Sequence, residues 1–370
     1  ITDALSRLLH YTKQTVKQIP LVLRMVVSRV SSRTALDEVD SNGDFKRVDA
    51  AWRSWISSKE GAEFPPEKDR YHLFVSYACP WAHRTLIVRA LKGLEDVISV
   101  TVVHPTWQAT KPGVGTGHTG WVFGNPDAEP FTNTAGRGGP FDASLPDTEP
   151  DPIYNSYSIR ELYERAGDTN GKYSVPILWD KEKATIVSNE SSEIIRMFNN
   201  EFNDFAKNPE LDLYPQDLRT SIDNVNKWVY PTINNGVYRC GFAASQQAYD
   251  KAIDELTESF DRIEEILQKQ KFIAGDSVTE ADIRLFVTLV RFDPVYIVYF
   301  KCNTRSVAAS PAILDYCRRV YQMPGVADTV NMRHIKQHYF TSHPNLNHYS
   351  IIPRGTDFEA LLKDPVNGKK

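Results

Sequence analysis

The residue best suited to do chemistry in this chain is Cys79, which lies in the stretch SYACPWAHRT at residues 76–85. An apolar run precedes it, and a helix-forming run that begins at Pro80 follows it. The unpaired N–H groups and the dipole of a helix N-terminus favour a thiolate, and such positions lower a cysteine pKa to about 3.5–7.5. His83 and Arg84 would add positive charge one turn further on. We therefore predict a reactive thiolate at Cys79; the alternative is a buried structural cysteine.

Cys79 lacks the partner that a dithiol motif requires, because Ala82 stands three residues later. Without that partner, a mixed disulfide formed at Cys79 must be resolved by a thiol from outside the protein. The spacing therefore predicts monothiol chemistry, with glutathione as the expected thiol.

The remaining cysteines and the histidines show no metal-ligand spacing. Cys240, Cys302 and Cys317 are too far apart for a zinc site or a disulfide framework, which favours a reducing compartment. Near the C-terminus, four histidines lack a cysteine or carboxylate framework, so we predict a polar surface and no metal there. They are His334, His338, His343 and His348.

Two further motifs would complete a site for a thiol peptide. In Val175-Pro176 a proline interrupts an apolar strand, and a cis peptide there would leave the N–H and C=O of Val175 free for an extended peptide. In SNESSEI, Glu190 and Ser191 stand at a helix start, where a carboxylate, a hydroxyl and backbone N–H groups can hold a γ-glutamyl end. An ordinary edge strand and a plain helix cap remain the alternatives.

The elements around Cys79 alternate between strand and helix. RYHLFVSY and VISVTVVH read as strands on either side of the helix WAHRTLIVRALKGL, which makes a βαβ unit. Residues 105–152 are dense in Gly, Pro, Thr and Asp and predict a long loop. A helix, the Pro176 strand, a short strand and the SNESSEI helix follow. After Asn203 the chain reads as helices only, so an α/β half precedes an all-α half.

Length and composition fit a two-domain protein. The chain has 370 residues, 41% of them hydrophobic and 24% charged, which is enough for a sizeable core. The net charge of −4 argues against nucleic acid as a partner. No apolar run approaches the ~18 residues that a membrane span requires.

Residues 1–35 differ in composition from the rest. They carry six lysines and arginines against one acid, Asp3, with the apolar segment IPLVLRMVV. That pattern is typical of organelle targeting segments and of helices that dock on a membrane or a partner; a solvated leader is the alternative. Residues 37–66 are polar and predict a loop-and-helix wrap anchored by Trp52 and Trp55.

Taken together, the motifs resemble the glutathione transferase superfamily, and within it the glutathionyl-hydroquinone reductases of the Xi class. The resemblance runs in order from about Tyr71 to Pro353 through CPWAHRTLI, VPILWDK, TIVSNESSEIIRMFN, NNGVY, TEADIRL, VRFDPVY, YQMPG and HYF. It implies an α/β thioredoxin-like N-terminal domain plus an all-α C-terminal domain. The expected division is an extension at 1–66, a glutathione-binding domain at 67–205 and a helical domain at 206–370.

The resemblance implies roles for the residues of the first domain. Cys79 is the catalytic thiolate, and Trp121, in the Gly-Trp-x-Phe element, stacks over glutathione. Val175 pairs with the glutathione backbone before the cis proline Pro176. Glu190 and Ser191 hold the γ-glutamyl end.

The resemblance also implies a phenol-binding pocket in the second domain. Tyr238 and Tyr339 hydrogen-bond the hydroquinone hydroxyls, and Tyr296 lines the same pocket. Without the resemblance, each of these tyrosines would be interpreted as a core residue. Thr279 and Asp282 match a helix capping box and are expected to serve folding.

The expected function is the glutathione-dependent reduction of glutathionyl-hydroquinones by a homodimer without a metal. One alternative is a thioltransferase or dehydroascorbate reductase of the omega type, which would use the same cysteine. Another is a transferase-like accessory subunit, docked to an organellar membrane complex through residues 1–35. The expected location is mitochondrial or plastid, with the cytoplasm as the alternative.

Overall fold

The computed structural model describes residues 34, 37–114 and 117–366. The chain divides into two units, Ile1–Ser31 and Ser32–Lys370, and the structure describes residues of the second unit only. The targeting and docking interpretations of residues 1–35 therefore lie, Thr34 apart, outside the described residues. Within the described part, no helix combines the length and the apolar character needed to span a membrane.

A parallel βαβ unit carries the Cys79 motif, as predicted. Strand β1 (Tyr71–Val75) pairs in parallel with β2 (Ser99–Val102), and helix α2 (Pro80–Lys92) connects them. All five residues of β1 are buried, which suits a central strand that is covered on both faces. The helix ends at Gly93, whose positive φ of 66° lets its N–H turn back to the carbonyls of the last turn.

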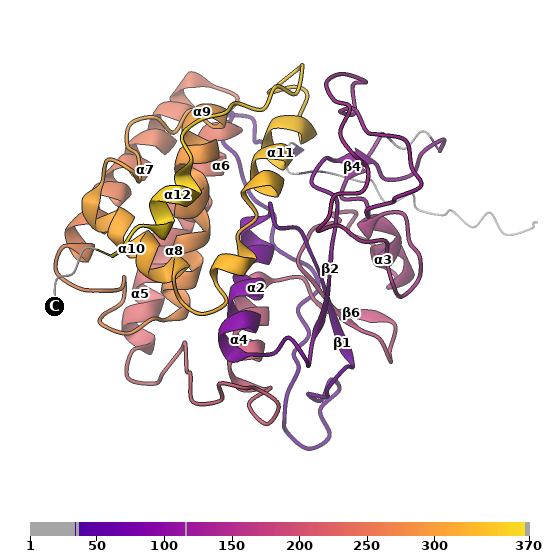
Figure 1. The fold of residues 1–370 in the computed structure, drawn as a ribbon, viewed down its shortest axis with the longest axis horizontal. Coiled ribbons are helices and arrows are strands. Elements are labelled where there is room, and N and C mark those ends of the chain that lie inside the picture. Colours follow the sequence, from indigo (N-terminus) through magenta and orange to yellow (C-terminus); the bar gives the residue numbers. More distant parts are fainter. Residues whose placement is uncertain (1–33, 35–36, 115–116, 367–370) are drawn as a thin grey trace, which may run out of the picture. The chain divides into compact units, whose positions relative to one another are not determined.

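Two antiparallel strands complete the sheet in the order β2-β1-β5-β6. Strand β5 (Ile177–Asp180) begins directly after Pro176 rather than running through it, and it pairs with β1 and with β6 (Thr185–Ser188). Helices α2 and α4 (Ser191–Asn200) lie on the side of the sheet that faces the helical half, and α3 (Ile159–Arg165) lies on the other side (Figure 1). This is the thioredoxin-like arrangement.

The predicted long loop, residues 105–152, contains little regular structure among its described residues. Its one ladder joins β3 (Gln108–Ala109) to β4 (Thr119–Gly120). The beginning of the loop is fixed to the helical half, because the Trp107 N–H donates to Ser342 Oγ at 3.0 Å and the Thr106 hydroxyl bonds that of Thr341 at 2.9 Å. The loop is therefore part of the packed body around the site.

The described part of the second half is helical, as predicted, with two π-helical turns that the sequence did not indicate. Its elements are α5 (Arg219–Val229), the π turn η2 (Tyr230–Asn234), α6 (Gly236–Gly241), α7 (Gln246–Leu267), α8 (Glu280–Arg291), the π turn η3 (Phe292–Tyr296), α9 (Ile297–Tyr299), α10 (Pro311–Tyr321), the 3₁₀ turn η4 (Ala327–Thr329), α11 (Met332–Ser342) and α12 (Phe358–Lys363).

The two halves pack through α2, α4 and α8. Helix α2 lies against both α4 and α8, and Arg196 on α4 binds the buried carboxylate of Glu280 on α8 at 2.8 Å. The predicted capping box is present at the start of α8, where Thr279 and Asp282 satisfy each other's backbone N–H groups.

Residues 37–64, which we call the strap, wrap both halves without forming the expected helix. The strap pairs with the edge of the sheet at β6, where the Ser54 N–H donates to the Val187 carbonyl at 2.9 Å. Trp52 anchors it as predicted, by donating its indole N–H to Asp168 at 3.0 Å. The expected role of Trp55 was wrong, because that ring is 40% exposed; the buried apolar anchors are Phe45, Ile56 and Phe64.

Candidate active site

Cys79 occupies the N-cap position of α2, as predicted. Its backbone is extended (φ −75°, ψ 118°), and Pro80 takes the first helical position, where a missing N–H costs no hydrogen bond. The side chain is only 8% exposed, and its thiol donates to the Val175 carbonyl oxygen at 3.4 Å. The nucleophile is thus held against the segment that was predicted to bind a thiol peptide.

The predicted lowering of the Cys79 pKa was wrong for the ligand-free protein. Burial raises the pKa of the Cys79 thiol above its ordinary value, since a thiolate loses its hydration there. The N–H groups of Ala82 and Trp81 and the charges of Arg291 and Arg47 lower it in part. The helix terminus favours the thiolate as expected, but the desolvation of the buried thiol outweighs it.

His83 and Arg84 do not supply the expected charge at the thiol. His83 is fully buried, and burial holds the pKa of its imidazole well below the usual value, so the ring is neutral. Arg84 points to the other end of the site, where it donates to Ser191 Oγ at 3.3 Å and to Asn234 Oδ1 at 2.9 Å. Both residues lie on α2, as predicted, but tertiary packing directs the Arg84 guanidinium away from the thiol.

Arg291, at the end of α8, supplies the positive charge near Cys79 that was predicted for His83 and Arg84. Its guanidinium donates to the carbonyls of Ala78 at 3.0 Å and Tyr77 at 2.7 Å, and to His83 Nδ1 at 3.0 Å. These bonds fix the turn that leads into Cys79 from the helical half of the molecule. Because Arg291 is fully buried, its charge acts on the thiol with little screening.

The Val175-Pro176 peptide is cis, as predicted. Val175 is buried, its carbonyl accepts the Cys79 thiol, and its backbone N–H donates no hydrogen bond within the described residues. A buried N–H without a partner is rare in folded proteins unless a ligand supplies the acceptor. The edge beside Cys79 is therefore open to an extended peptide backbone.

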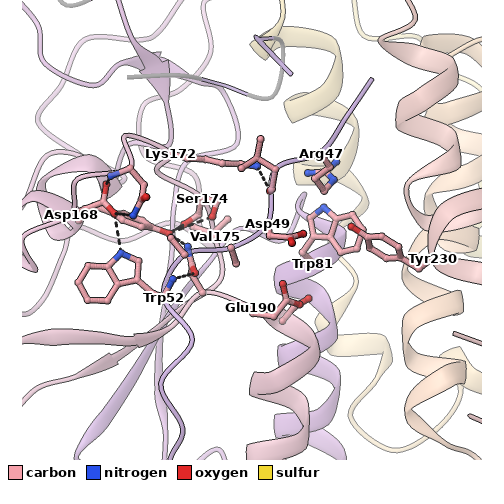
Figure 2. Close-up of a pocket in the computed structure, with 17 residues that line it drawn as sticks. Arg47, Asp49, Trp52, Trp81, Asp168, Lys172, Ser174, Val175, Glu190 and Tyr230 are labelled. Carbon is pink, nitrogen blue, oxygen red and sulfur yellow. Dashed lines mark hydrogen bonds between the residues drawn. The ribbon is translucent and has the colours of Figure 1, made fainter. Parts of the chain in front are cut away.

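A cavity runs past this edge in two connected halves. The first half is lined by Glu190, Ser191 and the strap residues 47–52. Figure 2 shows Arg47, Asp49, Trp52 and Glu190 around it. The second half contains Cys79 and the aromatic residues of both domains. Five residues line both halves and join them: Arg47, Trp81, Lys172, Ser174 and Val175.

Glu190 and Ser191 both line the first half, and Glu190 is also the N-cap of α4. The Glu190 carboxylate accepts the Ser192 N–H at 2.9 Å and the Ser192 hydroxyl at 2.7 Å, and it remains partly exposed in the cavity. The Ser191 hydroxyl accepts from Arg84. The helix-cap and ligand-binding interpretations are thus compatible, because the Glu190 carboxylate caps α4 and also lines the cavity.

Trp121 lies in the second half of the cavity, although it comes from the long loop. Its indole stacks on His338, with ring centroids 4.4 Å apart and an interplanar angle of 27°. His338 Nδ1 bonds the Pro105 carbonyl at 2.9 Å, so that nitrogen carries the proton. Trp121 is therefore held in place by a stacked histidine that comes from the helical half.

Tyr238, Tyr339 and Tyr296 form a chain of hydroxyl groups. The Tyr339 hydroxyl bonds that of Tyr238 at 2.7 Å and that of Tyr296 at 2.9 Å. Tyr238 and Tyr339 line the second half of the cavity, whereas Tyr296 is fully buried behind Tyr339 and does not line it. Burial raises the pKa of all three phenols, which keeps them protonated as hydrogen-bond donors.

The structure adds residues that sequence reasoning missed. The prediction of a polar histidine surface was wrong for three of the four residues: His334, His338 and His343 are buried, and the last two line the cavity. Arg47 and Trp81 line both of its halves. A signal existed for Trp81, which follows the Cys-Pro pair. None existed for Arg47 or His338, because the hydrogen bond of Arg47 to Asn235 spans 188 positions and that of His338 to Pro105 spans 233.

Comparison with known proteins agrees with this architecture. The model of the glutathione S-transferase N-terminal domain matches residues 78–201, and that of the C-terminal domain matches residues 246–319. The chain is 44% identical over 330 residues to a glutathionyl-hydroquinone reductase of Escherichia coli, covering 87% of this chain and 92% of that protein. It is also 44% identical to glutathione S-transferase omega-like 2 of Schizosaccharomyces pombe, covering 88% and 97%.

Solved structures lead to the same assignment. The Xi transferase of Phanerochaete chrysosporium superposes with a TM-score of 0.75 at 48% identity, covering 85% of this chain and 98% of that one. A glutathione-bound structure of the E. coli protein superposes with a TM-score of 0.74 at 44% identity, covering 86% and 96%. The structure agrees, because it has a thioredoxin-like half, a helical half and an N-cap cysteine beside a cis proline. The chain belongs to the glutathione S-transferase family of enzymes, in its Xi class of glutathionyl-hydroquinone reductases.

Proposed function

We propose that this enzyme reduces glutathionyl-hydroquinones through a mixed disulfide at Cys79. The Cys79 thiolate attacks the glutathione sulfur, an S–S bond forms and the carbon–sulfur bond breaks. The ring carbon keeps the electron pair and takes a proton, which yields the hydroquinone. A second glutathione then attacks the mixed disulfide, which releases oxidised glutathione and returns Cys79 to its thiol.

One observation carries this proposal: Cys79 and the open backbone edge of Val175 lie in the same cavity as the two phenols. The edge suits the peptide of glutathione, and Glu190 with Ser191 suits its γ-glutamyl end. Tyr238 and Tyr339 suit the oxygens of the ring, and their protonated hydroxyls can donate to an oxygen that gains charge as the carbon–sulfur bond breaks. The absence of a second thiol at Ala82 makes external glutathione the resolving group.

Intact-mass measurement tests the mechanism directly. The protein is mixed with the glutathionyl conjugate of menadiol, without free glutathione, and then glutathione is added. We expect one glutathione adduct on Cys79 together with released hydroquinone, and then loss of the adduct. Cys79→Ser should form no adduct and show no turnover; full activity in that variant would contradict the proposal.

A second candidate is a thioltransferase or dehydroascorbate reductase, favoured by the likeness to the omega-like protein of S. pombe. It would use the same Cys79 and the same glutathione site, so the phenols distinguish the two activities. If Tyr238→Phe and Tyr339→Phe reduce hydroquinone turnover but leave dehydroascorbate or disulfide reduction unchanged, the hydroquinone activity is the one for which the pocket is built. Equal effects on both would favour the second candidate.

We also propose that the enzyme is a homodimer directed to a mitochondrion or plastid by residues 1–35. The alternative of an accessory subunit in an organellar membrane complex makes a different prediction for native mass. Light scattering of the native protein should give twice the chain mass, whereas a subunit would migrate with its complex. N-terminal sequencing of the native protein would show whether residues 1–35 are removed.

A further inference from the structure

Arg47 of the strap lies between the two halves of the cavity. Its guanidinium carbon lies 4.9 Å from the ring centre of Trp81 and 4.8 Å from that of Tyr238 (Figure 2 shows Arg47 beside Trp81). Arg47 Nε donates to Asn235 Oδ1 at 2.9 Å, at the start of α6. The side chain is thus held in one place by stacking and by a hydrogen bond from the helical half.

The same guanidinium has a buried N–H group with no acceptor. Arg47 Nη2 is closed off from solvent, and no group among the described residues accepts from it. A buried charged donor without an acceptor costs free energy, so a ligand oxygen that accepted from it would be stabilised. Because Nε is fixed and the plane is set by the rings, this N–H has a defined direction within the site.

Of the two cations among the described residues that line the cavity, Arg47 is the one with a buried N–H group that no described residue accepts. Lys172 also lines both halves, but its ammonium is bound by the Glu38 carboxylate and by the Val48 carbonyl at 2.8 Å. The first half further contains the carboxylates of Asp49 and Glu190. An anionic ligand entering a space with these carboxylates requires a cation, and Arg47 is placed to supply it.

The strap is fixed by hydrogen bonds on both sides of Arg47. On one side, the Ala244 N–H donates to the Gly43 carbonyl at 2.9 Å and the Ser245 hydroxyl to the Asn42 carbonyl at 2.8 Å. On the other side, Val48 binds Lys172. The arginine is therefore presented rigidly, which reduces the entropy lost when a ligand binds.

We propose that Arg47 donates a hydrogen bond to an oxygen of the substrate, which makes the strap a part of the active site. This rests on the proposed function, since it deepens the account of the same site. Two parts of the substrate carry suitable oxygens: a carboxylate of glutathione and a hydroxyl of the hydroquinone. We expect the carboxylate, because it is charged at neutral pH and because the γ-glutamyl position at Glu190 and Ser191 lies in the half that Arg47 also lines.

Binding measurements separate Arg47 from the chemistry at Cys79. Calorimetry is performed in a Cys79→Ser background with two probes, glutathione and its menadiol conjugate, so that no turnover occurs. The variants are Arg47→Gln, Arg47→Lys and the matched control Arg53→Gln, which removes a strap arginine that pairs with Glu193 outside the cavity. Thermal melting of each variant checks the fold.

For Arg47→Gln we expect glutathione to bind about 10- to 100-fold more weakly, the value of a lost charged hydrogen bond. Arg47→Lys should recover part of that loss, because it keeps the charge but not the planar fork. Arg53→Gln should bind as the parent does.

The other outcomes are equally informative. A loss confined to the menadiol conjugate would assign the hydroquinone oxygen as the partner of Arg47. Equal binding of both probes by the parent and by Arg47→Gln, with the fold intact, would overturn the inference while leaving the chemistry of Cys79 untouched. Failure of the parent itself to bind glutathione would overturn both.

Discussion

The thiol of Cys79 is governed by two effects of opposite sign. The helix terminus and two arginines favour the thiolate, and burial against Val175 and the phenols favours the thiol. Sequence predicts the first effect, because the strand–Cys-Pro–helix pattern is local. It cannot predict the second, because the groups that cover Cys79 come from residues 47, 238 and 339.

The pH dependence of Cys79 alkylation follows from that balance. The raised pKa means that the ligand-free thiol is protonated at neutral pH and ionises only above its ordinary value of about 8.5. The rate of reaction with iodoacetamide should therefore keep rising beyond pH 8.5. Cys79→Ser, which retains three buried cysteines, provides the background rate. A rate that levels off below pH 7 would contradict the raised pKa.

The hydroxyl chain makes Tyr339 and Tyr296 a matched pair of test sites. Tyr339→Phe removes a proposed donor to the ring and leaves the hydroxyls of Tyr238 and Tyr296 without their shared partner. We expect kcat for the menadiol conjugate to fall about 10²-fold. Tyr296→Phe removes a hydroxyl that lies behind the pocket and should lower kcat far less. Equal losses would mean that the chain acts as a structural unit.

At the level of elements, the pattern of the sequence predicted the βαβ unit, the two later strands and most helices, but not the antiparallel direction in which the strands pair. Their apolar periods and capping residues are local signals, and α8 begins at the predicted Thr279–Asp282 box. The π turns η2 and η3 were missed, since a turn with one extra residue has no composition of its own. They matter because η2 leads into α6, which carries Tyr238, and η3 ends at Tyr296.

The capping box of α8 should be a strong determinant of stability. The buried Asp282 carboxylate accepts from the N–H groups of Ile273 and Thr279, each at 2.8 Å, and from the Thr279 hydroxyl at 2.9 Å. Asp282→Ala leaves these donors buried without an acceptor and should lower the free energy of unfolding by about 2–4 kcal/mol. Asp276→Ala, at an exposed position just before the helix, is the control for denaturant titration.

The same carboxylate predicts a pH dependence of stability. Burial outweighs the three donors and raises the pKa of Asp282 to about 6 in the folded protein, against about 3.9 in the unfolded chain. Between these values the folded state binds the additional proton, so the contribution of Asp282 to stability falls as pH rises from about 4 to 6 and is constant above. The difference in unfolding free energy between the parent and Asp282→Asn, measured across this range, should fall accordingly; a rising difference would contradict it.

For the whole molecule, the described residues that line the cavity run from Thr34 to His343. Deletion of residues 1–31 keeps all of these lining residues, so we expect kcat and KM for the menadiol conjugate to stay within about twofold of the full chain. Steady-state kinetics of the shortened protein, with Arg53→Gln in the full chain as a second reference, check this. A large loss would assign residues 1–31 to the site itself.

The sequence predicted the two halves of the molecule and most residues of the proposed site. It did not predict the contacts between the halves. Arg291 holds the turn before Cys79 from 212 positions further along the chain, and Arg47 reaches Asn235 across 188. Such contacts depend on the packing of α2 against α8 and on the course of the strap. No local pattern encodes them, which is why the charge near Cys79 was assigned to His83 and Arg84.

The span of the cavity along the chain has a consequence for synthesis. Cys79 leaves the ribosome long before Tyr339 and His343, which cover it in the finished protein. At roughly 5–20 residues per second, the intervening 260 or so residues take on the order of 10–50 s. During that interval the thiol has a helix terminus to activate it and no pocket to bury it. The nascent chain is therefore more reactive toward cellular disulfides at Cys79 than the folded enzyme is.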